Sequence, residues 1–300
     1  MALYRNYNFV FAICHPDDEA LWIGGVLCEL SRFEFIKSYV ICLSGNDAQS
    51  PRVEEFKAAQ NVAGYSQGVI LGGALRPAPD PLPDTRATLE QGLRMVGLAP
   101  AAIDVLITHA DYGDEHLHPH HKQAHAELKS WCSRSNVPFG HFSSIPINGL
   151  CHIPILTDLR RHKTLHLMNL SRCESFDAPG DSPVDGEPSE RSHPQYYVQW
   201  LCDPSAKLRM LNCYASINLE LHRRGYAMFT NSCESLYLWD RRALEPWQAI
   251  IDNMEVPAEA KLMSPRAVVR VQDPTEKSKM RGKAHVFRKV IRHGLAWIGR

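Results

Sequence analysis

Residues 8–19 read NFVFAICHPDDE, an apolar run followed at once by a histidine, a proline and three acids. The run at 8–14 has the length and apolar character of a buried strand, and residues 19–31 continue with apolar side chains at helical spacing. Ligands of α/β sheets bind outside the carboxyl ends of the strands. The stretch therefore predicts a strand–helix unit with a functional site at its junction.

The same alternation continues through the first half of the chain. Apolar runs at 38–44, 68–71 and 104–109 have the character of strands, and residues 51–64 and 85–97 have that of helices. Strands that alternate with helices indicate a parallel sheet covered by helices. We therefore expect a Rossmann-like α/β domain with a mostly parallel sheet flanked by helices.

The C-terminal half is less regular in sequence. Residues 177–195 are rich in proline, glycine, serine and acids, which indicates an exposed loop that is either a lid over the site or a simple connection. A helix is expected at 204–223 and a late strand at 237–240. We divide the chain into a larger domain at 1–245 and a C-terminal extension at 246–300.

Composition places the protein among soluble globular chains. Of its 300 residues, 44% are hydrophobic and 22% charged, and the formal net charge is zero. Nine cysteines without a CxxC pair indicate a reducing compartment. The N-terminal apolar run is too short for a signal peptide, and no run is long enough to span a membrane. These features predict a cytoplasmic protein.

The end of the chain is strongly basic. Residues 266–300 contain ten Lys and Arg against two acids, and within 285–300 apolar side chains recur at helical spacing. This pattern is typical of a basic amphipathic helix at an anionic membrane surface, which would place the protein peripherally at the inner face of the membrane. A helix packed on the acidic body, or a disordered tail, is the alternative. No nucleic-acid-binding module accompanies the charge, so no nucleic-acid partner is expected.

Histidines gather in one short segment. Six of the fifteen lie between residues 109 and 125, and histidine is the commonest metal ligand. His118 and His121 would share a face of a helix in which Pro119 suits the first turn. Catalytic zinc takes three protein ligands and needs a carboxylate nearby for proton transfer. Asp17 and Asp18 can divide the roles of ligand and base.

The sequence HPDDE at 15–19 and the HxxH pattern at 118–121 together resemble the PIG-L/LmbE-like family of zinc-dependent N-deacetylases. Weaker matches extend the resemblance over roughly residues 7–240. They are Gly24 and Gly25, Arg52 and Glu55, Lys207 with Tyr214 and Ser216, and Glu234.

The resemblance implies a role for each matching residue. One Zn²⁺ per chain would be held by His15, Asp18 and His121. Asp17 would be the general base, and His118 would be an acid or an oxyanion-stabilising group. Arg52 would contact hydroxyls of the substrate; pairing with Glu54 or Glu55 on its own helix is the alternative.

The implied reaction is removal of an acetyl group from an amino sugar or a sugar conjugate such as a glycolipid, nucleotide sugar or natural-product glycoside. The expected partner is therefore an N-acetylated, sugar-like small molecule. Two alternatives stay open. One is an amidase for another small N-acyl substrate, such as a cysteine conjugate. The other is a non-catalytic scaffold docked to a membrane.

Two departures from the family pattern concern proton transfer. Many relatives read HPDH where this chain reads HPHH, so His120 replaces an aspartate that could tune the pKa of the neighbouring histidine. The segment DYGDEHL at 111–117, before His118, is also longer and more acidic than the family pattern, and its Asp114 or Glu115 could supply the missing carboxylate. Four further histidines of the segment fit a structural or solvated role as well as a functional one: His109, His116, His120 and His125.

Overall fold

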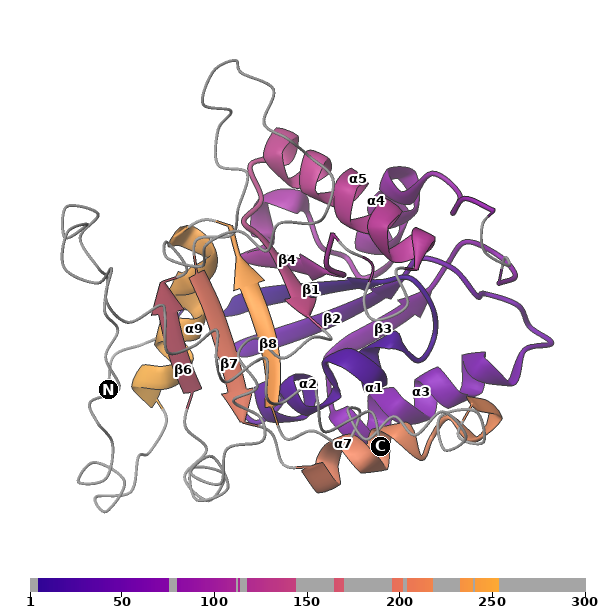
Figure 1. Ribbon diagram of the computed structural model, residues 1–300, viewed down its shortest axis with the longest axis horizontal. Helices are drawn as coiled ribbons and strands as arrows, with labels where there is room; N and C mark the ends of the chain where they lie inside the picture. Colours follow the sequence, from indigo (N-terminus) through magenta and orange to yellow (C-terminus); the bar gives the residue numbers. More distant parts are fainter. Residues whose placement is uncertain are drawn as a thin grey trace, which may run out of the picture.

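The computed structural model (Figure 1) describes nine segments of the chain. They are residues 5–75, 80–111, 113, 118–143, 165–169, 196–201, 204–217, 233–239 and 241–253. Asp114, Glu115 and His116, the loop at 177–195 and the basic tail at 285–300 lie outside them, so the expectations for these residues stay predictions. Among the described residues, no helix combines the length and the apolar character needed to cross a bilayer.

The described strands form one eight-stranded sheet in the order β3-β2-β1-β4-β5-β8-β7-β6. The first five are parallel, with β1 and β2 paired from Tyr7 against Ile36 to Ile13 against Cys42. They are β1 (Tyr7–Ile13), β2 (Ile36–Cys42), β3 (Gln67–Ile70), β4 (Val105–Thr108) and β5 (Phe139–Ser143). The expected Rossmann-like α/β fold with a mostly parallel sheet is confirmed.

The second half of the chain completes the sheet with antiparallel strands. These are β6 (Leu165–Asn169), β7 (Tyr196–Leu201) and β8 (Cys233–Leu238). The late strand expected at 237–240 begins earlier, at Cys233, because β8 pairs along its length with β7. The strands β5, β6 and β7 were not expected from the sequence.

Helices cover both faces of the sheet (Figure 1). On one face lie α4 (Thr85–Met95) and α5 (Pro119–Ser135). On the other lie α1 (Asp18–Trp22), α2 (Gly24–Leu30), α3 (Pro51–Ala63) and α7 (Pro204–Leu211). Of the helix expected at 204–223, α7 forms residues 204–211 and a further helical turn follows at 215–217, while residues 218–223 lie outside the described part of the chain.

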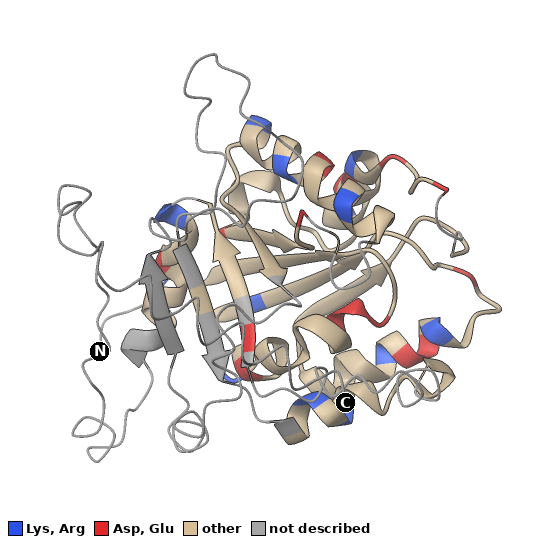
Figure 2. Cartoon of the chain, viewed as in Figure 1, with Lys and Arg blue, Asp and Glu red and all other residues tan. Residues whose placement is uncertain are grey.

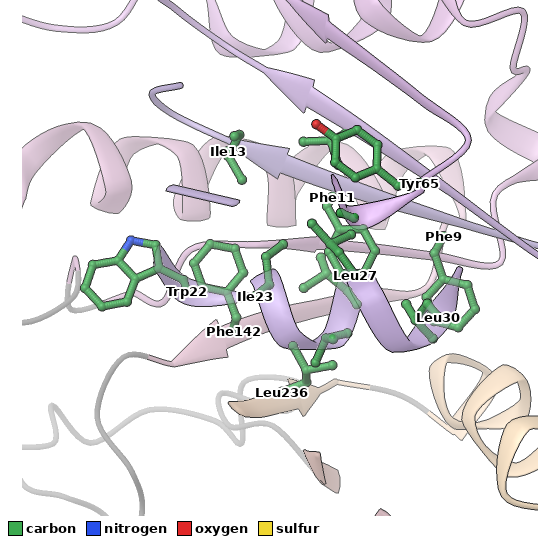
Figure 3. Packing of buried hydrophobic residues seen from close by; sticks show 14 of the residues in the cluster. Phe9, Phe11, Ile13, Trp22, Ile23, Leu27, Leu30, Tyr65, Phe142 and Leu236 are labelled. Carbon is green, nitrogen blue, oxygen red and sulfur yellow. The ribbon is translucent and has the colours of Figure 1, made fainter. Parts of the chain in front are cut away.

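The sheet separates two hydrophobic cores. Phe9, Phe11 and Ile13 of β1 point towards α2, where Figure 3 shows them beside Ile23 and Leu27. The intervening side chains of β1 point to the core under α4 and α5. This alternation follows from the two-residue period of a strand, and burial on both faces explains why β1 reads as a continuous apolar run.

The helix expected at 19–31 is broken at Ile23 into α1 and α2. The amides of Gly25 and Val26 at the start of α2 donate to the Glu234 carboxylate, at 3.0 and 2.7 Å. The first amides of a helix lack partners within it, so a buried carboxylate there stabilises a new helix start. Glu234 also pairs with the buried ammonium of Lys207 at 2.8 Å.

The expected boundary between domains falls inside a helix. α9 (Glu245–Asn253) crosses residue 246, and its Trp247 and Ile250 lie in the core on the α2 side of the sheet. The Trp247 ring packs edge-on against Phe9 of β1, with the centroids 4.9 Å apart. The division at 245 and 246 stays a prediction, and the residues beyond Asn253 lie outside the described part of the chain.

Breaking the buried pair should destabilise the fold. We expect Glu234→Leu to cost about 3–5 kcal/mol of unfolding free energy, because the Lys207 charge would stay buried without its partner. Lys207→Met combined with Glu234→Leu should cost less, since neither charge then remains. Urea denaturation followed by circular dichroism measures both.

A surface pair provides the control. Lys57 and Glu54 form an exposed ion pair on α3 at 2.7 Å, and Lys57→Met should change the unfolding free energy by less than about 1 kcal/mol. If Glu234→Leu cost no more than this control, the buried pair would not stabilise the junction of α2, α7 and β8.

Candidate metal centre

The expected site lies where the chain reverses its direction of travel across the sheet. From β1 the chain moves outward to β2 and β3, and it then returns to place β4 on the other side of β1. Sheets of this kind bind ligands at such a switch point, beyond the carboxyl ends of the strands. His15 and Asp18 follow β1, and His121 lies in the first turn of the helix after β4.

Three donor atoms form a nearly equilateral triangle at this point. Asp18 Oδ2 lies 3.4 Å from His15 Nδ1 and 3.5 Å from His121 Nε2. The two histidine nitrogens are 3.4 Å apart. Tetrahedral zinc with ligands at about 2.0–2.2 Å requires donors about 3.3–3.6 Å apart. The three residues therefore fit one zinc ion, for which they would supply three of the four tetrahedral donors.

Two other groups of three donors lie within 4.8 Å of one another in the described part of the chain. They are His15, His118 and His121, and Cys14, His109 and His121. In both, two imidazoles are stacked. The rings of His109 and His121 lie 3.7 Å apart at 18°, and those of His118 and His121 lie 4.6 Å apart at 26°. The planes of stacked rings are close to parallel, so their in-plane lone pairs converge poorly on one ion. The triangle through Asp18 is the better fit.

Asp17 has a strained backbone. Its φ of 143° and ψ of −27° lie outside the regions that L-residues favour. Such strain costs about 1–3 kcal/mol and persists where surrounding contacts hold it. The Asp17 amide donates to Glu19 Oε2 at 3.2 Å, and its carbonyl accepts from the amides of Ala20 and Leu21. Glu19 is itself buried and accepts a hydrogen bond from the Tyr214 hydroxyl.

The two aspartates have different electrostatic environments. Burial raises the pKa of the Asp17 carboxyl to about 7, the charge of Asp18 adds to the rise, and Arg52 opposes it. Burial also acts to raise the pKa of Asp18, but His121 and His109 outweigh it and hold that pKa well below its ordinary value. Asp18 is therefore permanently ionised, as a ligand must be, while Asp17 is suited to exchange a proton near neutral pH.

His118 carries its proton on a defined nitrogen. Burial lowers the pKa of His118 to about 3, with the neighbouring His121 and His15 contributing, so the ring is neutral at pH 7. His118 caps α5, and its Nδ1 accepts the amide of His120 at 3.3 Å. A neutral ring that accepts at Nδ1 has its proton on Nε2. His118 can therefore donate a hydrogen bond through Nε2 to a developing oxyanion.

Arg52 contacts the expected base. Its guanidinium lies 3.2 Å from Asp17 Oδ2, and its side chain is about a quarter exposed. The two acids considered as its helix partners bind elsewhere: Glu54 pairs with Lys57, and Glu55 accepts from the amide and hydroxyl of Ser216. Contact of Arg52 with substrate hydroxyls stays a prediction.

The structure adds His109 to the residues at the centre. His109 is completely buried, and its Nε2 lies 3.3 Å from Asp18 Oδ2 and 3.1 Å from the Cys14 amide. Its backbone carbonyl accepts from His125 Nδ1 at 2.8 Å. From the sequence, His109 fits a structural or solvated role as well as a functional one. Its position directly after β4, at the switch point, was the signal for a functional role.

The acids at the start of α1 lie inside the fold, unlike many of the other charged residues. Figure 2 shows the acidic start of α1 within the fold, whereas many other charged segments lie on the outer turns of α3, α4 and α5. Ionised groups in the interior require compensation. The His15 amide and the Trp22 indole, which donate to Asp18, and the Arg52 guanidinium beside Asp17 provide part of it, and a divalent cation would provide the rest.

Comparisons with known proteins show similarity in structure alone. No family model and no curated protein matches the chain. A deacetylase in the biosynthesis pathway of teicoplanin is 15% identical with a TM-score of 0.45, over 77% of this chain and 97% of that chain. N,N′-diacetylchitobiose deacetylase from Pyrococcus horikoshii is 14% identical with a TM-score of 0.44, over 81% and 88%. The 4-carboxy-2-hydroxymuconate hydratase from Pseudomonas putida is 14% identical with a TM-score of 0.38, over 77% and 95%.

The metal content of the purified protein checks the triangle. We expect about one zinc ion per chain by elemental analysis, and its loss in His121→Ala, which removes one of the three donors. His125→Asn is the matched control on α5. It keeps a donor for the His109 carbonyl and should keep the metal. Metal retained in His121→Ala but lost in His125→Asn would contradict this ligand set.

Proposed function

We propose that this protein is a zinc-dependent N-deacetylase that acts on an N-acetylated amino sugar or sugar conjugate. The observation that carries the proposal is the triangle of His15, Asp18 and His121 with the buried Asp17 carboxyl beside it. Three protein ligands with an open fourth position are typical of catalytic zinc, whereas structural zinc takes four. A carboxylate at such an open position supports hydrolysis.

The chain's own residues can perform the proton transfers of amide hydrolysis. Zinc, when bound, lowers the pKa of a water molecule towards about 7 and polarises a carbonyl. Asp17 takes the proton from the attacking water and passes it to the leaving nitrogen. His118 donates its Nε2 proton in a hydrogen bond to the oxyanion of the tetrahedral intermediate. Acetate and a free amine are released.

Arg52 and Glu19 support the base. Arg52 holds the Asp17 carboxylate by an ion pair, and Glu19 holds its backbone amide. A base that is held at both its carboxylate and its main chain keeps the carboxylate in the orientation that proton transfer requires. The strained backbone of Asp17 is thereby part of the arrangement that aims the carboxylate.

The substrate class rests on the sequence resemblance. HPDDE and HxxH resemble a family that removes acetyl groups from amino sugars, and the same residues meet at one point in this structure. An amidase for another N-acyl substrate would use the same residues, and a substrate panel separates the two. A panel of N-acetyl sugars and N-acetylcysteine conjugates, scored by acetate release, identifies the preferred class.

Asp17→Asn tests the enzymatic role. The amide cannot accept the proton, so kcat should fall by about 10²–10⁴-fold while the zinc content stays at one ion per chain. Acetate release measures the first effect and elemental analysis the second. Glu54→Gln, on the exposed face of α3, is the control and should leave kcat unchanged. Full activity in Asp17→Asn would mean that another group is the base.

Arg52→Met distinguishes two roles for the arginine. If Arg52 positions the base, kcat should fall about tenfold with little change in KM. If it binds substrate hydroxyls equally well in the ground and transition states, KM should rise with kcat unchanged. The contact with Asp17 favours the first result, and steady-state kinetics on the best substrate of the panel measures the split.

A further inference from the structure

His120 connects a predicted metal ligand to the protein backbone. Its Nδ1 lies 2.9 Å from His15 Nε2, and its Nε2 lies 2.6 Å from the backbone carbonyl oxygen of Asp80. His120 is buried and lies in the first turn of α5, next to His121.

The Asp80 carbonyl determines which ring nitrogen of His120, and then of His15, carries the proton. A carbonyl oxygen only accepts, so His120 must carry a proton on Nε2. In the neutral ring Nδ1 then has a lone pair, and it can only accept from His15 Nε2. His15 therefore has its proton on Nε2 and a lone pair on Nδ1. That lone pair is on the atom that lies 3.4 Å from both Asp18 Oδ2 and His121 Nε2.

We propose that His120 fixes the tautomer of His15, so that Nδ1 faces the metal position with a lone pair. The inference rests on the proposed function, because it assigns His120 a role towards the metal. His120 is a positioning residue: it acts through His15 and touches neither the metal position nor the substrate. Groups that orient metal-ligating histidines in this way are typically carboxylates, carbonyls or water. Here the imidazole of His120 stands between the ligand and a backbone carbonyl and is hydrogen-bonded to both.

The other tautomer would block the site. A proton on His15 Nδ1 would point between Asp18 and His121, where the ion must sit, and it would have to be displaced before binding. Holding the proton on Nε2 removes that cost. The bond also sets the rotation of the ring about its side-chain axis, which determines whether the three donors form the triangle.

A structural role for His120 makes a different prediction. His120 could merely hold the loop around Asp80 against α5. Gln123 does this independently, since its side chain accepts from the Leu82 amide at 2.9 Å and donates to the Leu82 carbonyl at 3.3 Å. Gln123→Ala loosens the same loop and leaves the bond between His120 and His15 in place, so it is the matched control.

The first experiment reads the tautomer directly. ¹⁵N-labelled protein, stripped of metal by a chelator, is examined by long-range ¹H–¹⁵N NMR, which separates the two ring nitrogens of each histidine. His15, assigned with His15→Gln, should be protonated on Nε2 in the wild type. His120→Phe should give a mixture of tautomers. A wild-type His15 protonated on Nδ1 would overturn the inference, whatever the metal affinity.

The second experiment measures affinity for Zn²⁺ by competition with a chromophoric chelator. His120→Phe keeps an aromatic ring without nitrogens, and it should bind Zn²⁺ about 10–100-fold more weakly. His120→Asn places its side-chain oxygen where Nδ1 was and loses only the hydrogen bond to the Asp80 carbonyl. Its affinity for Zn²⁺ should therefore be close to that of the wild type. Gln123→Ala should bind as the wild type does. Thermal melting confirms that each variant is folded.

The outcomes separate the two proposals. If Gln123→Ala weakens binding as much as His120→Phe, or if His120→Asn gives no recovery, His120 acts only through the loop and the inference is wrong. If the wild type binds Zn²⁺ with the expected pattern but no N-acyl substrate is hydrolysed, the proposed function fails while the role of His120 stands. If the wild type binds no Zn²⁺, both fail.

Discussion

Asp18 carries its charge into the interior of the protein, where an ionised carboxylate is stable only among hydrogen-bond donors or opposite charges. It accepts from the amide of His15 and from the indole of Trp22, and three imidazoles lie within 3.5 Å of its Oδ2. These imidazoles come from the turn after β1, from the end of β4 and from the start of α5. Three separate segments therefore meet at a single oxygen, and Asp17, His118 and His120 lie on two of these segments.

The parallel half of the sheet could be predicted because its signals are local. Apolar runs and helical periodicity located β1 to β4, α3 and α4. The break at Ile23 could not be predicted in this way, because the carboxylate that starts α2 comes from Glu234 on β8. The antiparallel strands are five or six residues long and their apolar residues are interrupted by polar ones, such as His166 in β6, Gln199 in β7 and Glu234 in β8. Their pairing partners, more than their own sequences, therefore define them.

The candidate site shows the same contrast. Order along the chain was enough to group His15, Asp17, Asp18, His118 and His121, which the structure brings together at the switch point. The supporting contacts were not readable, because they involve atoms without a sequence signature. The Asp80 carbonyl that orients His120 is one such atom, and the Glu19 oxygen that holds the Asp17 amide is another. Residue types predict which chemistry is present, whereas contacts set by the folded backbone determine how the functional side chains are oriented.

The contacts that shape the turn after β1 have a consequence for the order in which the molecule is made. A ribosome translates His121, the last of the three donors, more than a hundred residues before Cys233, the first residue of β8. The partners of the turn emerge much later, since Glu19 and Tyr214 are 195 positions apart and Gly25 and Glu234 are 209. Contacts at such separation form slowly. A nascent chain can thus assemble its donors long before Asp17 is held in position, and chains that end prematurely before β8 lack the support of α2.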